Sequence, residues 1–186
     1  RGGQLHVLQW LRDSGCPWDE YAMEMAASMG HVPILEWAFN HGCPAGENTM
    51  WSATSGGHID AVQWLLEHGH QWTAEFSIGT ALLGNLEMLQ WAAGRGLAMD
   101  GQNVMCGAAR KGQMEVLKWG QERGLEFEEQ ILMLSAVEES QMEVLKWGQE
   151  RGLDFDGELL MCLAAKKGQV EVLKWGQERG LDFDGQ

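Results

Sequence analysis

The apolar residues of this chain recur at helical spacing, separated by polar positions and closed by glycines. In residues 57–69 (GHIDAVQWLLEHG), apolar side chains follow Gly57 at positions 2, 4, 5, 7, 8 and 9. This spacing places them on one face of a helix, whereas a strand would alternate strictly. A glycine ends each such stretch, as expected for a helix that stops in the left-handed conformation. The closing glycines are Gly15, Gly42, Gly69, Gly96, Gly124, Gly152 and Gly180.

A tryptophan within this helical stretch returns at intervals of 27 residues three times and then 28 residues three times. A fixed interval of this kind is typical of an array in which one helical unit stacks on its next copy. We therefore expect a single repeat domain over residues 1–186, with about seven repeats, of which the first and the last are incomplete. The tryptophans are Trp10, Trp37, Trp64, Trp91, Trp119, Trp147 and Trp175. The repeats begin near residues 3, 30, 57, 84, 112, 140 and 168.

Each repeat also has room for a helix that precedes the tryptophan-containing one. Capping residues such as Asp19 and Asp100 follow the closing glycine and can accept an N–H of a new helix. This first helix ends near a pair of small residues, such as Ala26-Ala27, which lets two antiparallel helices approach closely. The tryptophan lies on the second helix. We expect first helices at about 19–29, 47–55 and 74–83, and second helices at about 31–41, 58–68 and 85–95.

The residues from Ala26-Ala27 to Gly42, and from Ala53 to Gly69, follow the pattern AA-x-x-GH-x-x-x-(V/L)-x-x-L-L-x-x-G. This pattern resembles the ankyrin repeat, and the resemblance covers essentially the whole chain. It implies an all-α, helical-repeat solenoid of stacked helix-turn-helix units. The TPLH opening of the family is absent, and each repeat is about five to six residues shorter than the usual 33. The deletion falls where the family has β-hairpin fingers, so we expect these fingers to be shortened or absent.

Composition excludes several classes of partner. The net charge of -14 would repel a phosphate backbone, so we expect no nucleic acid as a partner. No run approaches the roughly 20 apolar residues that span a bilayer, so we expect no direct membrane insertion.

Equivalent cysteines of neighbouring repeats should be too far apart for a disulfide, and no CxxC or HxxxH pair indicates a metal site. We therefore expect reduced thiols and an intracellular, reducing compartment, in the cytoplasm or inside an organelle.

The repetition itself argues against an active site. Residues 113–125 (QMEVLKWGQERGL) recur unchanged at 141–153, and at 169–181 with Val170 in place of Met. A side chain present in several equivalent copies is poor material for catalysis, which needs one convergent set of groups. The chain has no glycine-rich phosphate loop and no recognisable catalytic set. We expect no enzyme and no cofactor.

The last two residues of each first helix are the most informative column of the array. Along the chain this column changes from small or apolar residues to charged pairs. In ankyrin-like arrays the position lies on the concave side, so the resemblance implies a partner-binding groove. Trp51 joins the candidates because its own column is otherwise not aromatic. The candidate partner-binding residues are Met29, Trp51, Leu82, Leu83, Arg110, Lys111, Glu138, Glu139, Lys166 and Lys167.

The charged part of this column has a second interpretation. Glu138 and Glu139 stand between the basic pairs of the neighbouring repeats, which would also suit a ladder of salt bridges between repeats. Exposed ion pairs of that kind contribute only about 0–1 kcal/mol each. The sequence leaves both interpretations open.

The function that we favour is a protein–protein interaction scaffold, which binds a polypeptide partner on its concave face. One alternative is a permanent structural subunit or linker of a large multiprotein assembly. A third possibility is a regulatory repeat segment of a longer enzyme.

Two packing expectations remain. Glycine in the interior of a second helix costs about 0.5–1 kcal/mol, so Gly120, Gly148 and Gly176 should make room for a neighbouring Met or Trp. No repeat follows the last second helix in this sequence. We therefore expect its apolar residues to contact another chain or to be more exposed than their counterparts. The residues compared are Val172, Leu173 and Trp175 with Val116, Leu117 and Trp119.

Overall fold

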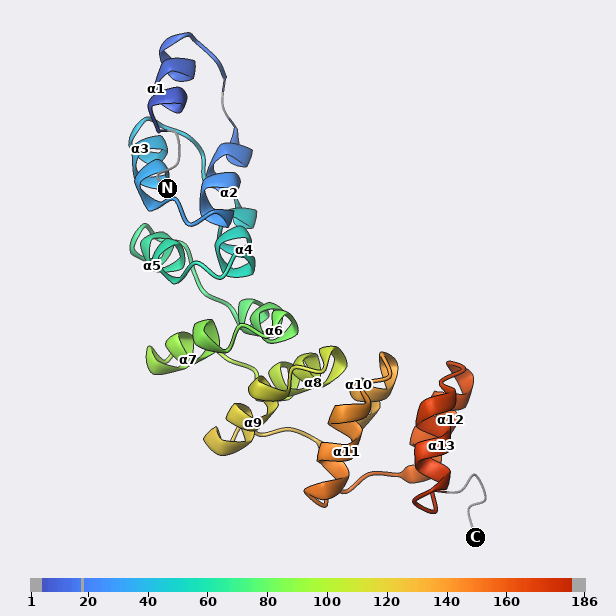
Figure 1. The fold of residues 1–186 in the computed structure, drawn as a ribbon. Coiled ribbons are helices and arrows are strands. Elements are labelled where there is room, and N and C mark those ends of the chain that lie inside the picture. Colours follow the sequence, from blue (N-terminus) through green and yellow to red (C-terminus); the bar gives the residue numbers. More distant parts are fainter. Residues whose placement is uncertain (1–4, 18, 182–186) are drawn as a thin grey trace. The chain divides into compact units, whose positions relative to one another are not determined.

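The computed structural model describes residues 5–17 and 19–181, and these residues form helices and no strands (Figure 1). The longest helix has 11 residues, and no helix in the described part of the chain could cross a membrane. The helices are α1 (Leu5–Asp13), α2 (Glu20–Ser28), α3 (Val32–Asn40), α4 (Glu47–Ser55), α5 (Ile59–Glu67), α6 (Ala74–Leu83), α7 (Leu86–Gly94), α8 (Gly101–Lys111), α9 (Met114–Arg123), α10 (Glu129–Glu138), α11 (Met142–Glu150), α12 (Gly157–Lys166) and α13 (Val170–Gln177).

The all-α fold expected from the sequence is confirmed. The six helices expected between residues 19 and 95 are α2 to α7, and each boundary agrees to within one residue. The even-numbered helices are the first helices of their repeats, and the odd-numbered helices are the second helices. The links between repeats contain no strand among the described residues.

The helix ends are fixed by the residues that the sequence pattern indicated. The carboxylate of Asp19 accepts the N–H of Tyr21 at 3.1 Å, and that of Asp100 accepts the N–H of Asn103 at 3.0 Å. All seven closing glycines have φ between 68° and 90°, the left-handed region that favours glycine. Asp caps at the start of first helices and left-handed glycines after second helices therefore delimit the short helices of the repeats.

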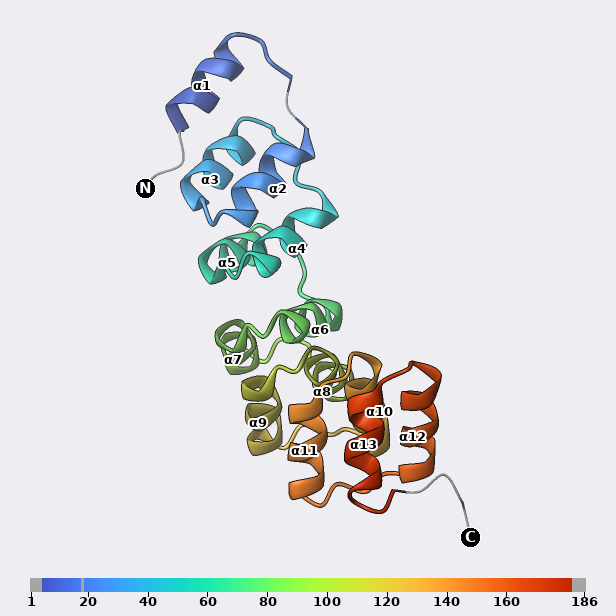
Figure 2. The ribbon, with the colours of Figure 1, turned by 45° about the vertical axis from the view of Figure 1, so that its right-hand side comes forward.

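The helices form two compact units, which we describe separately. The N-terminal unit comprises residues 1–80 and 87–98, and the C-terminal unit comprises residues 81–86 and 99–186. In the N-terminal unit α2 packs beside α4, and α3 packs beside α5 (Figure 1). In the C-terminal unit α10 packs between α8 and α12, while α11 and α13 pair with the first helices of their own hairpins (Figure 2). Each unit thus stacks helix on like helix.

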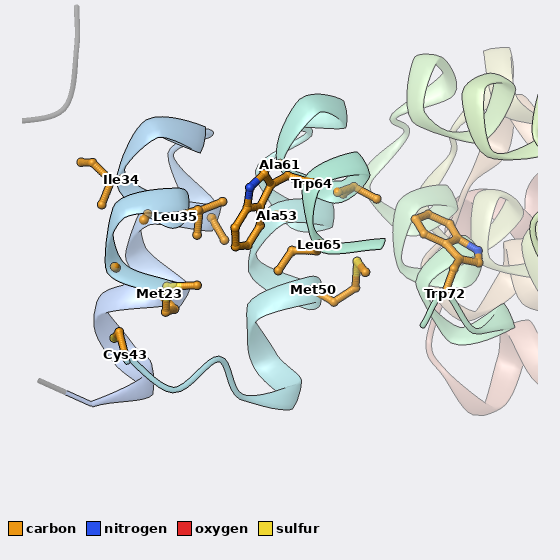
Figure 3. Packing of buried hydrophobic residues seen from close by; sticks show 14 of the residues in the cluster. Met23, Ile34, Leu35, Cys43, Met50, Ala53, Ala61, Trp64, Leu65 and Trp72 are labelled. Carbon is orange, nitrogen blue, oxygen red and sulfur yellow. The ribbon is translucent and has the colours of Figure 1, made fainter. Parts of the chain in front are cut away.

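The core of the N-terminal unit is built from the apolar stripes of these helices. Met23, Leu35, Met50 and Leu65 are fully buried, and Met50 lies beside Leu65 where α4 meets α5 (Figure 3). Large side chains of the first and second helices therefore meet in this core and fill it.

Trp72 connects the segment before α6 to Ala98, the last residue of this unit. Its indole N–H donates to the carbonyl oxygen of Ala98 at 3.0 Å, and Ser77 also donates to that oxygen at 2.9 Å. Ser77 occupies the position that is Met in the other five first helices from α2 to α12. Its buried hydroxyl is therefore satisfied by a hydrogen bond in place of the apolar contact that Met would make.

In the C-terminal unit, the methionine of each first helix packs against a glycine of the second helix, where the N-terminal unit has Leu65. A side-chain carbon at Gly120, Gly148 or Gly176 would overlap the sulfur of a buried methionine of the neighbouring first helix. The expectation that these glycines make room for a neighbouring residue is confirmed. The methionines that occupy the space are Met105, Met133 and Met161.

The expectation for the last helix is only partly correct. Leu173 is more exposed than its buried counterpart Leu117, as expected. Val172 is fully buried and Trp175 is 3% exposed, so the expectation of greater exposure was wrong for these two residues. Helix α13 packs against α12 of its own hairpin, so its apolar residues need no following repeat to be buried.

Candidate functional site

The charged end of the candidate column forms an ion-pair ladder in the C-terminal unit. Arg110 Nε lies 2.7 Å from Glu138 Oε2, and Lys111 Nζ lies 2.7 Å from Glu139 Oε1. Lys167 Nζ donates to the carbonyl oxygen of Glu138 at 3.2 Å. Five of the ten candidates therefore lie together at the ends of α8, α10 and α12, and we call them the charged ladder.

The charged ladder is exposed. The side chains of Arg110, Lys111, Glu138 and Glu139 keep 40–45% of their accessible surface. Ion pairs in this setting contribute little to stability, about 0–1 kcal/mol each, because water screens them. The same exposure leaves their charges accessible to a partner. The geometry thus satisfies the ladder interpretation and keeps the surface available for binding.

The apolar candidates lie on other first helices. In the N-terminal unit, Met29 directly follows α2 and is 53% exposed, while Trp51 lies in the middle of α4 and is 44% exposed. In the C-terminal unit, Leu83 is exposed at the end of α6. The carbonyl oxygen of Leu82 accepts a hydrogen bond from Gln113 Nε2 at 3.2 Å. Lys166, the remaining candidate, is exposed at the end of α12.

Three exposed apolar residues were missed by the sequence analysis. Tyr21, Ile131 and Leu159 occupy equivalent positions in α2, α10 and α12, and each is at least 43% exposed. The same position carries Asn48 and Glu75 in α4 and α6. The signal that could have identified them is an apolar or aromatic residue at a position that is polar in the other three repeats.

Trp51 forms one wall of a pocket in the N-terminal unit. Its ring occupies the space that a side chain at Gly79 would need, and it lies 6.4 Å from the ring of Phe76, at an interplanar angle of 36°. The pocket has a volume of about 490 Å³. Its lining residues are Glu47, Asn48, Met50, Trp51, His70, Gln71, Thr73, Glu75 and Phe76.

The charge of this pocket is set by its carboxylates. Burial lowers the pKa of His70, and the nearby His68 lowers it further. His70 is therefore neutral at neutral pH, while Glu47 and Glu75 line the same pocket. The result is a negatively charged pocket with two aromatic walls.

No three His, Cys, Asp or Glu side chains of the described residues gather into a group that could hold a metal ion. All four cysteines are free thiols. Burial raises the pKa of Cys43 and of Cys106, which disfavours the reactive thiolate.

The arrangement of these helices matches that of known repeat proteins. The human ASB11 ankyrin repeat domain is similar over 88% of this chain and 86% of its own chain, with a TM-score of 0.66 and 16% sequence identity. This chain has the ankyrin repeat fold. No family model matches the sequence, and no curated protein matches it either.

The ankyrin repeat fold is typically an interaction module without enzymatic activity. Arrays of this fold generally mediate binding between proteins. The candidate site of this chain is an exposed surface of repeated helices.

Proposed function

We propose that this protein binds a polypeptide partner through the exposed surface of its first helices, the side that is concave in ankyrin arrays. One observation carries the proposal: within the first helices, a buried column is nearly constant and an exposed column varies. The buried column has Met in five repeats, and the exposed column has a different residue type in nearly every repeat. The buried residues are Met23, Met50, Met105, Met133 and Met161. The exposed residues are Tyr21, Asn48, Glu75, Asn103, Ile131 and Leu159.

This pattern separates folding from recognition. The constant methionines fill the same space in each hairpin, because a flexible thioether adapts to small differences in its neighbours. Variation on the exposed side changes no packing and lets each repeat contact a different part of a partner.

The C-terminal unit has the features of an interface. Ile131 and Leu159 are 43% and 47% exposed, and they lie on the same helices as Glu138 and Lys166. Apolar anchors with a charged border are typical of protein interfaces, where the anchors provide affinity and the charges provide specificity.

Site-specific photo-crosslinking tests this proposal. A benzophenone amino acid replaces Tyr21, Ile131 or Leu159 on first helices, and Glu36, Lys118 or Lys146 on second helices serve as matched exposed controls. In cells of its own source, the first-helix positions should yield one discrete polypeptide adduct that the controls do not yield. Adducts from the second-helix positions alone, or from no position, would overturn the proposed surface.

A permanent structural subunit would give a different result. Such a subunit is enclosed by its assembly, so both sets of positions should crosslink, at near-stoichiometric yield. Adducts confined to the first helices distinguish the scaffold from that alternative.

A further inference from the structure

The pocket beside Trp51 combines features that the repeat pattern does not explain. Trp51 and Phe76 supply two ring faces at an angle of 36°, and Gly79 leaves the space in which the Trp51 ring lies. Glu47 and Glu75 add two carboxylates at the pocket lining. An open cavity of about 490 Å³ is large enough to admit one long side chain of another molecule.

No Lys or Arg is among the residues that line the pocket. No Lys or Arg occurs between Asp13 and Gly94, and this stretch includes ten Asp or Glu residues. Neither Glu47 nor Glu75 takes part in any ion pair in the described residues. No cationic Lys or Arg side chain therefore offsets the two carboxylates at the pocket lining, which favours a negative potential there.

We propose that the pocket beside Trp51 receives a positively charged side chain of a polypeptide partner, with the arginine guanidinium as the group that fits best. The inference rests on the proposed function as an interaction scaffold and names the chemistry of one contact. A cation over the face of Trp or Phe is attracted by the ring quadrupole. A guanidinium also stacks on a ring and donates charge-assisted hydrogen bonds to carboxylates, which a lysine ammonium does less effectively.

The combination occurs once among the first helices that the structure describes. At the position of Trp51 the other first helices carry Glu24, Ile78, Cys106, Leu134 and Cys162, none of which is aromatic. The pocket would therefore fix the register of a partner along the array, because one basic residue of the partner fits at one place only.

The test uses a small probe and its neutral isostere. N-acetyl-arginine amide is titrated into the full chain, and N-acetyl-citrulline amide serves as the control that has the same shape without the charge. We expect saturable NMR shifts of the Trp51 indole and the Phe76 ring with the arginine probe, at a dissociation constant in the millimolar range. Citrulline should bind markedly less. Absence of saturable shifts at Trp51, or equal shifts with both probes, would overturn the inference.

Variants separate the ring contribution from that of the carboxylates. Trp51→Leu should weaken binding of the arginine probe roughly 3- to 30-fold, the range of one lost cation–π contact. Glu47→Gln combined with Glu75→Gln should also weaken it and leave the helical circular dichroism unchanged. Unchanged affinity in either variant, with helicity retained, contradicts the proposed contact.

A matched control removes the effect of net charge. Glu36→Gln combined with Glu67→Gln makes the same charge change on α3 and α5, outside the pocket lining, and should leave probe binding as it is. An equal loss in this control would assign the effect to the general acidity of the unit and overturn the pocket. Crosslinking of a partner to the first helices without probe binding at Trp51 would reject this inference alone and leave the proposed function standing.

Discussion

The N-terminal and C-terminal units are built from the same type of repeat, but different kinds of side-chain contact hold their helices together. Between Asp13 and Gly94 the chain has no Lys or Arg, and its core contains Met beside Leu and aromatic contacts. The C-terminal unit has Met against Gly and ion pairs between successive repeats. The backbone pattern therefore sets the fold, and more than one kind of contact can connect its repeats.

The periodic tryptophans show the difference at a single position. In the N-terminal unit, the ring of His41 stacks on Trp37 with centroids 4.3 Å apart. In the C-terminal unit, the guanidinium of Arg151 lies 5.6 Å from the ring centroid of Trp147 and donates to Gln121 of the preceding second helix. The change begins inside the N-terminal unit, where the guanidinium of Arg95 lies 4.9 Å from the ring centroid of Trp91 and donates to Gln63 of the preceding second helix. The residue four places after the tryptophan thus changes along the chain from a local stacking partner to a bridge between repeats.

Substitutions in the packing of Met against Gly should give the largest loss of stability. Gly148→Ala places a methyl group against the sulfur of Met133, which should lower the free energy of unfolding by about 1–3 kcal/mol. Met133→Ala empties a fully buried site and should cost about 2–5 kcal/mol. In the Met133→Ala background the overlap is gone, so Gly148→Ala should stabilise by about 0.5–1 kcal/mol through helix propensity. Urea unfolding of the four proteins measures this change of sign.

The N-terminal unit provides the contrast. Met50 meets Leu65 there, so Met50→Ala and Leu65→Ala should each destabilise, and neither should reverse sign in the background of the other. If Gly148→Ala still destabilises the chain that lacks the Met133 side chain, contact with the sulfur does not explain the glycine.

The charged ladder should give the next largest effect. Glu138→Lys combined with Glu139→Lys breaks the ion pairs with Arg110 and Lys111 and places like charges together. We expect a loss of about 1–2 kcal/mol at low ionic strength, and a smaller loss in high salt. The melting temperature at two salt concentrations measures it. If the ladder also contacts a partner, the association rate with that partner should fall in a salt-sensitive way.

The same charge reversal in the N-terminal unit is the matched control. Glu36 and Glu67 belong to no ion pair in the described residues, and the surrounding stretch is acidic. Glu36→Lys combined with Glu67→Lys should therefore leave the melting temperature unchanged or raise it. An equal destabilisation would mean that the ladder has no special role in the C-terminal unit.

Backbone strain at Ser140 should give an effect of about 1 kcal/mol. Ser140 has φ of 56° and is the one non-glycine residue with positive φ in the described chain, at a position that is glycine in the repeats that begin at 30, 57, 84, 112 and 168. A left-handed conformation costs a residue with a side chain roughly 1–2 kcal/mol. Ser140→Gly should therefore raise the free energy of unfolding by about 1 kcal/mol, less the backbone entropy that glycine loses on folding.

Gly168→Ser is the reverse experiment. Gly168 has φ of 69° and open space around a side-chain position, so only backbone strain opposes a serine there. Gly168→Ser should lower the free energy of unfolding by about the amount that Ser140→Gly raises it. Thermal unfolding that shows no opposite shift in the two variants would remove backbone strain as the cause.

Periodic features of this molecule could be predicted from the sequence, and features that occur once could not. The spacing of the tryptophans and closing glycines indicated the helices to within one residue, because each repeat supplies the same signal again. The pocket depends on Trp51, Gly79 and Phe76, which lie on two first helices and belong to different columns. The sequence identified Trp51 as an exception, but the ring that faces it and the glycine that admits it emerged only from the packing of α4 and α6.

The smallest expected effect concerns His70 and the pH dependence of the N-terminal unit. Burial, and then the electrostatic interaction with His68, lower the pKa of His70 in the folded chain, although Glu47 and Glu75 line the same pocket. The unfolded chain, with a histidine pKa of about 6.5, therefore binds a proton more readily than the folded chain. The folded chain is therefore most stable relative to the unfolded chain above about pH 6.5. This part of the free energy of unfolding is lost as the pH falls through the lowered pKa of the folded state. His70→Gln should make unfolding less sensitive to acid between about pH 7 and 5, as urea midpoints would show. An unchanged pH slope in this variant would show that another group controls the acid sensitivity of the unit.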